Sequence, residues 1–153
     1  MIDGGPATVG VESTVIDLTG PTAVLLRQGG LPEEELVAAI GRLEYARADG
    51  PIKSPGMLAS HYAPRLPLRL NAANVGKDEA LLAFGPVVPQ GAHTVLNLSS
   101  AGDLVEAASH LFDYLHRLDA SGARAIAAMP IPSRGLGRAI NDRLRRAAVP
   151  ASK

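Results

Sequence analysis

Strand-forming residues dominate the beginning of the chain, in two runs that a turn separates. Residues 7–18 and 23–27 are rich in Val, Ile, Leu and Thr, which is typical of β-strands. Between them, Thr19-Gly20-Pro21-Thr22 has the composition of a turn. The pattern therefore predicts a β-hairpin over residues 7–27. One face of its first strand would carry Val9, Val11, Ser13 and Val15.

A helix is predicted directly after this hairpin. Gln28-Gly29-Gly30 ends the second strand, and Pro32 suits the first turn of a helix because its fixed φ is helical. Three consecutive glutamates, residues 33–35, follow at the positive end of the helix dipole. The expected apolar stripe of this helix consists of Leu36, Ile40 and Leu43.

A proline-rich connector, residues 51–67, separates two differently organised halves of the chain. Prolines at 51, 55, 64 and 67 fix φ and remove backbone donors, so this segment is not expected inside a helix or a central strand. A loose linker would instead be rich in Gly and Ser. We therefore predict a stiff connector that holds its aromatic pair, His61 and Tyr62, in a set place.

The second half of the chain alternates short apolar runs with helical spacing. Strands are predicted at 68–70, 80–84, 94–98 and 125–129. A long helix is predicted from the spacing of Leu104, Ala108, Leu111, Leu115 and Leu118, with Ser99 or Ser100 as its cap. A last helix is expected from about Gly137 to Ala148. The alternation indicates an α/β fold with a small parallel or mixed sheet.

Composition narrows the class of protein. The 153 residues are 46% apolar and 20% charged, which is normal for one globular domain or two small ones. Lys plus Arg and Asp plus Glu balance at 15 each, so the overall charge indicates neither a nucleic acid nor a membrane partner. The absence of cysteine excludes disulfides and suits a cytoplasmic protein, and no apolar run is long enough to predict a membrane span.

Two residues of the hairpin are candidates for binding an anionic substrate. Ser13 lies in the first predicted strand, where a hydroxyl can hold a carboxylate or phosphate oxygen. The alternative is a serine that bonds to a neighbouring backbone group. Arg27 ends an apolar strand beside Gly29 and Gly30, an arrangement that favours a phosphate grip. The alternative is an arginine that merely marks the strand end.

The connector and the last helix carry further candidates. His61 and Tyr62 could stack on a base or donate to an anion, and the alternative is a packed linker pair. No second ligand lies at metal-binding spacing, so no zinc site is predicted.

His93, His110 and His116 read as ordinary surface residues. The last helix opens after the glycine turn Gly135-Leu136-Gly137 and carries four arginines, Arg138, Arg143, Arg145 and Arg146; they predict a solvated face, with a tRNA backbone contact as the alternative.

Taken in order, these motifs resemble the threonylcarbamoyl-AMP synthase family in its two-domain form. The resemblance rests on residues 3–5, 9–17 and 26–30, on Pro55-Gly56-Met57 with His61-Tyr62-Ala63-Pro64, and on residues 135–144. It implies that residues 1–50 are the tail of a YrdC-type α/β catalytic domain. It also implies that residues 51–67 are a linker and that residues 68–150 form a small Rossmann-like domain.

The resemblance also implies an activity. The family makes L-threonylcarbamoyl-AMP and pyrophosphate from L-threonine, bicarbonate and ATP with Mg²⁺, and the product serves threonylcarbamoyl modification of an adenosine in tRNA. On matching positions, Ser13 would contact L-threonine, Arg27 the ATP phosphates, and His61 with Tyr62 the nucleotide.

The first part of the family's catalytic domain has no counterpart in this sequence. We therefore expect the chain to be the C-terminal portion of something longer and to have little synthase activity alone, and a short native protein is the alternative. A non-catalytic accessory module that binds a partner protein or tRNA is the competing interpretation of the whole chain.

Overall fold

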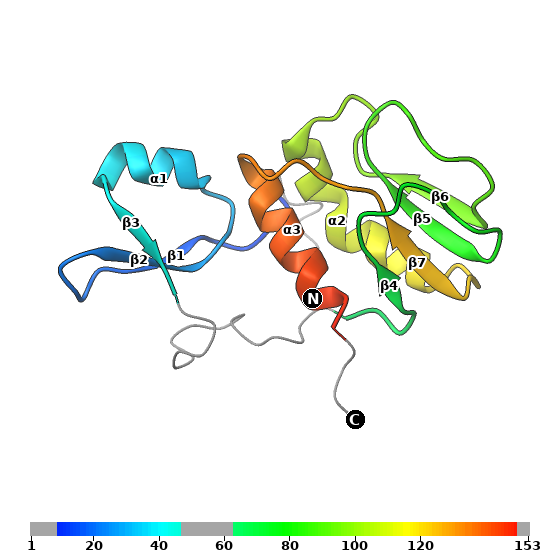
Figure 1. Cartoon of the computed structure of the whole chain (residues 1–153), viewed down its shortest axis with the longest axis horizontal. Coiled ribbons are helices and arrows are strands. Elements are labelled where there is room, and N and C mark those ends of the chain that lie inside the picture. Colours follow the sequence, from blue (N-terminus) through cyan, green and yellow to red (C-terminus); the bar gives the residue numbers. More distant parts are fainter. Residues whose placement is uncertain (1–8, 47–62, 150–153) are drawn as a thin grey trace, which may run out of the picture.

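A computed structural model of the chain describes residues 9–46 and 63–149. The elements in chain order are β1 (Val15–Asp17), β2 (Ala23–Arg27), α1 (Glu33–Ile40), β3 (Leu43–Tyr45), β4 (Leu68–Arg69), β5 (Glu79–Ala83), β6 (Thr94–Asn97), α2 (Leu104–Asp119), β7 (Ala125–Ala128) and α3 (Leu136–Ala147). They form two separate sheets with α3 between them (Figure 1). We call residues 9–46 the N-terminal unit and residues 63–149 the C-terminal domain.

The N-terminal unit is a three-stranded sheet in the order β1-β2-β3. The predicted hairpin is confirmed, because β1 and β2 pair antiparallel with a register shift between Val15 and Ile16. The first strand is shorter than predicted, and within the described residues 9–14 are not part of it. Val9 and Val11 pack instead against the core of the C-terminal domain, so the predicted face shared with Val15 is wrong.

The predicted helix after Pro32 is α1, with all three glutamates in its first turn. Its apolar stripe is shorter than expected. Leu36 is buried, but Ile40 is 41% exposed, and Leu43 follows Gly41 into β3. The sequence did not predict β3, which pairs in parallel with β2 although its own residues are half-buried or exposed.

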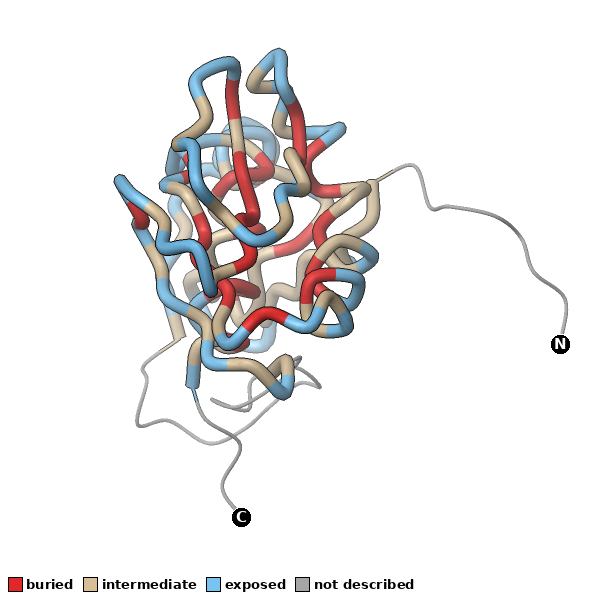
Figure 2. Tube along the Cα trace, turned by 90° about the vertical axis from the view of Figure 1, so that its right-hand side faces the viewer, coloured by how far each residue is buried: buried red, intermediate tan, exposed pale blue. Residues whose placement is uncertain are grey.

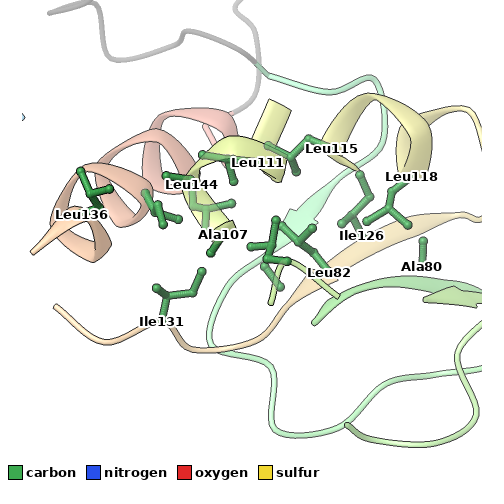
Figure 3. Close-up of a cluster of buried hydrophobic side chains, with 14 of the residues drawn as sticks. Ala80, Leu82, Ala107, Leu111, Leu115, Leu118, Ile126, Ile131, Leu136 and Leu144 are labelled. Carbon is green, nitrogen blue, oxygen red and sulfur yellow. The ribbon is translucent and has the colours of Figure 1, made fainter. Parts of the chain in front are cut away.

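The C-terminal domain is built on a four-stranded parallel sheet in the order β4-β7-β5-β6. All four predicted strands are confirmed. Helices α2 and α3 cover one face of this sheet, where side chains from both helices meet alternate residues of β5 and β7 (Figure 3). That core contains Leu82, Leu98, Leu111, Leu118, Ile126, Ile140 and Leu144, each at most 2% exposed.

Loops rather than helices cover the other face of the parallel sheet. Leu81, Ala83 and Ala127 point to this side and pack with Ala72 and with residues of the connecting segments. The β4–β5 and β5–β6 connections are short and contain Asn, Gly and Pro, which do not favour helix. The domain therefore has helices on one face only, unlike a doubly wound sheet.

Helix α2 begins one turn later than the predicted serine cap. Its N-cap is Asp103, whose carboxylate accepts the backbone N–H groups of Val105 and Glu106 at 2.7 and 3.0 Å. The Ser99 hydroxyl is buried, accepts the Asp103 N–H at 2.9 Å and bonds to the Glu106 carboxylate. The prediction of a serine cap was therefore wrong. Ser99 instead stabilises the N-cap residue, Asp103, by accepting its backbone N–H.

Buried positions gather in the interior and exposed ones at the loop tips (Figure 2). Across the described ranges 9–46 and 63–149, none of the helices combines the length and apolar character that crossing a membrane requires.

Candidate functional site

Ser13 and Arg27, which the sequence singled out separately, lie in contact. The Arg27 guanidinium donates from Nε and one Nη to the Ser13 carbonyl oxygen, at 3.2 and 2.9 Å. Both side chains come from segments next to the β1–β2 pairing, where Val15 is the register partner of Arg27. The structure therefore brings together the two predicted site residues that it describes. His61 and Tyr62 lie outside the described residues.

The loops that carry these two residues are tied to each other along their length. We call residues 12–14 and 27–31 the site loops. The Gly30 N–H donates to the Glu12 carbonyl at 2.9 Å, and the Thr14 hydroxyl both donates to the Leu31 carbonyl and accepts its N–H, at 2.8 and 3.0 Å. Backbone and side-chain bonds thus fix the separation of the two loops at three points.

Glycine at position 29 is required for this approach. A Cβ atom there would lie 2.3 Å from the Thr14 nitrogen and 2.4 Å from the Glu12 carbonyl oxygen. Such contacts with backbone atoms cannot be relieved by a side-chain rotation. The Gln28-Gly29-Gly30 sequence, predicted to end a strand and to lie beside the Arg27 guanidinium, therefore also allows the site loops to touch.

An open hollow of about 490 Å³ lies beside the site loops. Its polar side consists of Ser13, Thr14 and Gly30, and its apolar side of Val9, Val11, Ile16, Leu31 and Leu36. Ser13 is exposed there, and within residues 9–46 and 63–149 its hydroxyl has no hydrogen-bond partner. Arg27 does not line the hollow but contacts Ser13 at its edge. The arrangement offers a hydroxyl and a nearby cation at the rim of an apolar wall.

The C-terminal domain holds the site loops through Arg143 on α3. Its guanidinium donates to the Glu12 carboxylate at 2.8 Å, to the Gln28 carbonyl at 3.0 Å and to the Asp142 carboxylate at 2.6 Å. Its side chain is only 1% exposed. The prediction that the arginines of the last helix form a solvated face is therefore wrong for Arg143. No local signal in the sequence connects residues this far apart.

Arg138, five residues before Arg143 in the same helix, binds α1. It donates to Glu33 at 2.8 Å and to Glu34 at 3.1 Å, and Glu33 also accepts the Tyr45 hydroxyl. Burial opposes the charge on Arg138, but the two glutamates outweigh it and raise the pKa of Arg138. The pKa of Glu34 is lowered, first by its own backbone N–H and then by the Gly135 N–H and Arg138, against partial burial. Arg138 also departs from the predicted solvated face.

Two of the remaining predicted residues, His93 and His110, make contacts within the fold. His93 bonds to the Ser121 carbonyl, and His110 bonds to the Leu98 carbonyl and stacks on Tyr114 with ring centroids 4.7 Å apart. His110 is therefore half-buried rather than on a purely polar side. Among the described residues, no group of three or more His, Asp and Glu side chains could hold a metal ion.

Comparison with known proteins identifies relatives of this chain. The family model described as threonylcarbamoyl-AMP synthase, C-terminal domain, matches residues 31–149. The threonylcarbamoyl-AMP synthase of Pyrococcus abyssi (strain GE5 / Orsay) is 37% identical over 164 residues, which cover 96% of this chain and 48% of the relative. The one of Bacillus subtilis (strain 168) is 32% identical over 167 residues, covering 97% and 48%.

Solved structures show the same similarity. The crystal structure of P. abyssi Sua5 complexed with L-threonine has a TM-score of 0.81 and 32% identity, over 95% of this chain and 48% of that one. A P. abyssi Sua5 variant with alanine in place of an adjacent histidine and tyrosine gives 0.78 and 30%, over 95% and 47%. The chain thus spans about half the length of these relatives.

Proposed function

Because this chain belongs to the threonylcarbamoyl-AMP synthase family, we propose that it forms one wall of the active site of such an enzyme. The enzyme would make L-threonylcarbamoyl-AMP and pyrophosphate from L-threonine, bicarbonate and ATP, for threonylcarbamoyl modification of tRNA adenosine. The single observation that carries the proposal is the contact of Arg27 with Ser13 beside an open hollow. In this proposal, residues 1–50 are the tail of the YrdC-type catalytic domain and residues 51–67 its linker.

The chemistry asks for positioning and for positive charge. The threonine amine and bicarbonate first give an N-carboxy-threonine carbamate: the N–C bond forms, a C–O bond of bicarbonate breaks, and water leaves. A carbamate oxygen then bonds to the α-phosphorus of ATP while the bond from that phosphorus to the bridging oxygen breaks, and pyrophosphate leaves. Charge builds on phosphate oxygens, so a fixed cation such as Arg27 stabilises the transition state, and an apolar wall excludes water that would hydrolyse the carbamate.

Each proposed contact has its own support. Ser13 would hold the threonine moiety, because its exposed hydroxyl has no partner among the described residues and a structural relative is described as complexed with L-threonine. His61 and Tyr62 would contact the nucleotide. This chain has one adjacent His-Tyr pair, and an adjacent His-Tyr pair is replaced in the P. abyssi Sua5 variant.

Mg²⁺ would accompany ATP in this reaction. Magnesium commonly keeps several waters and is bound by substrate phosphates with one or two carboxylates. The described residues hold no group of three metal-ligating side chains, so the ion would reach this wall with the nucleotide. It would neutralise charge on the phosphates.

The test compares the isolated chain with a completed protein, in which the N-terminal half of the P. abyssi relative precedes this chain. Pyrophosphate release that depends on threonine, bicarbonate and ATP is expected from the completed protein and hardly at all from the chain alone. Arg27→Lys and Arg27→Ala in the completed protein should lower turnover by about 10²-fold or more. Arg42→Ala is the matched control, because Arg42 is 80% exposed in the same unit.

Two outcomes would overturn the proposal. Robust turnover by the isolated chain would show that this wall does not need the other half. Unchanged turnover after both Arg27 substitutions and after the double change His61→Ala, Tyr62→Ala would favour the accessory-module interpretation. The tRNA-binding alternative has lost part of its basis, since Arg138 and Arg143 are engaged in ion pairs. Salt-sensitive RNA binding that is lost on the double change Arg145→Ala, Arg146→Ala would revive it.

A further inference from the structure

Arg143 connects α3 to both site loops at once. Its two long-range partners are 131 and 115 residues away in sequence, and each is the immediate neighbour of a proposed site residue: Glu12 precedes Ser13, and Gln28 follows Arg27. One planar guanidinium therefore ties the Glu12 side chain and the Gln28 backbone, which neighbour Ser13 and Arg27, to α3. A lysine could not do this, because its ammonium is a compact point charge without the fork.

Stability alone does not account for a cation at this place. A buried ion pair costs desolvation energy, and well-packed apolar residues of similar volume are often as stabilising. Here the Arg143 side chain is 1% exposed and its guanidinium has three oxygen acceptors, while Asp142 also binds Arg146 at 3.0 Å. What the pair provides and an apolar contact would not is a fixed direction for each acceptor. Because Glu12 and Gln28 are the chain neighbours of Ser13 and Arg27, fixing the orientation of these two acceptors would also orient Ser13 and Arg27.

Two further contacts keep the same pieces in place. Gly10 lies so close to α2 that a Cβ atom there would be 2.3 Å from the Ala108 carbonyl oxygen. Arg138 holds α1 through Glu33, and the Gln28 amide also lies 3.4 Å from Glu33. The polar network thus runs from α3 through Glu33 and Gln28 to the loop that carries Arg27.

We propose that Arg143 is a positioning residue: through it, the C-terminal domain holds Ser13 and Arg27 in the mutual geometry that substrate binding requires. This inference rests on the proposed function of Ser13 and Arg27. It assigns to the C-terminal domain a task in catalysis without any contact of that domain with substrate.

The first test uses the full chain and needs no activity. Hydrogen exchange is measured by mass spectrometry in peptides covering the site loops and, separately, β5 and α2. Arg143→Met and Arg143→Lys are each expected to speed exchange in the site loops by about tenfold or more, while exchange in β5 and α2 stays within about twofold. Arg145→Met is the matched control, because Arg145 is exposed on the same helix.

A uniform rise in exchange across both units, or no rise in the site loops, would overturn the proposal. If Arg143→Met does not fold, Arg143→Lys and Glu12→Gln decide, since each keeps most of the volume; the first removes the guanidinium fork and the second removes the charge of one of its acceptors. Glu12→Gln should loosen the same peptides as Arg143→Lys does.

The second test uses the completed protein defined above. Arg143→Lys should lower kcat/KM for threonine by about tenfold, because a displacement of about 1 Å at a reacting group can cost up to 10²-fold. Arg145→Met should leave it within about twofold. If the unsubstituted completed protein shows no turnover, the proposed function fails, and the catalytic task of Arg143 fails with it; the exchange data then still decide whether α3 orders the site loops. If the completed protein turns over and Arg143→Lys leaves that turnover unchanged, the positioning role of Arg143 is refuted while the proposed function stands.

Discussion

In the C-terminal domain, side chains from two helices and two loops cover both faces of a parallel sheet, so Leu81, Leu82 and Ile126 are at most 1% exposed. In the N-terminal unit, α1 covers only part of a three-stranded sheet. Among the apolar residues described there, Leu25 and Leu36 alone are buried, and Leu18 and Tyr45 are 64% and 57% exposed. The first region has a closed core, and the second has an open one beside a hollow of about 490 Å³.

This difference indicates which contacts hold the site loops in place. A small sheet without a closed core gains little from apolar burial, since a two- or three-stranded sheet needs a packed face for stability. The N-terminal unit is held in addition by the C-terminal domain: Val9 and Val11 pack against its core, and Arg138 and Arg143 on α3 bind polar groups of the unit. The residues proposed to bind substrate are thus the ones whose geometry depends most on the neighbouring domain.

A core truncation gives the largest expected effect and tests the closed core. Leu111→Ala, at a side chain 0% exposed on α2, should lower the free energy of unfolding by about 2–5 kcal/mol. Leu36→Ala should cost less, about 1–2 kcal/mol, because Leu36 lines the open hollow and is not enclosed by the closed core. Urea denaturation measures both, and Val105→Ala, at a residue 50% exposed on α2, serves as the control. Equal losses at Leu111 and Leu36 would show that the two regions are buried alike.

The second prediction concerns the contact between the site loops. Gly29→Ala places a Cβ atom 2.3 Å from the Thr14 nitrogen, so the loops must separate at a cost of about 1–3 kcal/mol. The loss should be local: limited proteolysis should cut the N-terminal unit faster while the C-terminal domain survives as a fragment. Gly20→Ala is the control, because its Cβ would meet nothing nearer than 3.9 Å. Loss of the C-terminal fragment would contradict the independence of the closed core.

Much of the fold was predictable because it depends on short-range patterns. Apolar runs bounded by Gly and Pro gave the four strands of the C-terminal domain, and the spacing from Leu104 to Leu118 gave α2. The hairpin and the acidic start of α1 were equally local. Ser13 and Arg27 were predicted separately, Ser13 as a hydroxyl within the first predicted strand and Arg27 as a cation at the end of the second, and the structure places the Arg27 guanidinium on the Ser13 carbonyl.

The parts that could not be predicted depend on contacts between distant segments. β3 forms because β2 offers an edge, not because Leu43-Glu44-Tyr45 is strongly strand-forming. Val9 and Val11 leave the hairpin because the core of the C-terminal domain lies beside them. Arg143 looks like any other arginine on a polar helix until Glu12 and Gln28 are placed against it. The role of His61 and Tyr62 stays a prediction.

The smallest expected effect sharpens the comparison at the surface, where Glu34 meets Arg138 and the Gly135 N–H. The pKa of Glu34 is lowered in the folded protein, so this carboxylate contributes stability that is present above its unfolded pKa and is lost as the pH falls through the folded value. Because Glu34 is 51% exposed, solvent screening limits the contribution to about 0.5 kcal/mol or less.

Carbon-detected NMR titration should show the pKa of Glu34 rising toward its ordinary value in Arg138→Gln. The variant Glu34→Gln should remove part of the acid-dependent loosening of α1, whereas Glu35→Gln, at an exposed neighbour, should not. An unchanged titration of Glu34 in Arg138→Gln would mean that backbone N–H groups, its own and that of Gly135, lower the pKa of Glu34 without Arg138, and that the Glu34–Arg138 pair contributes nothing to holding α1 on α3.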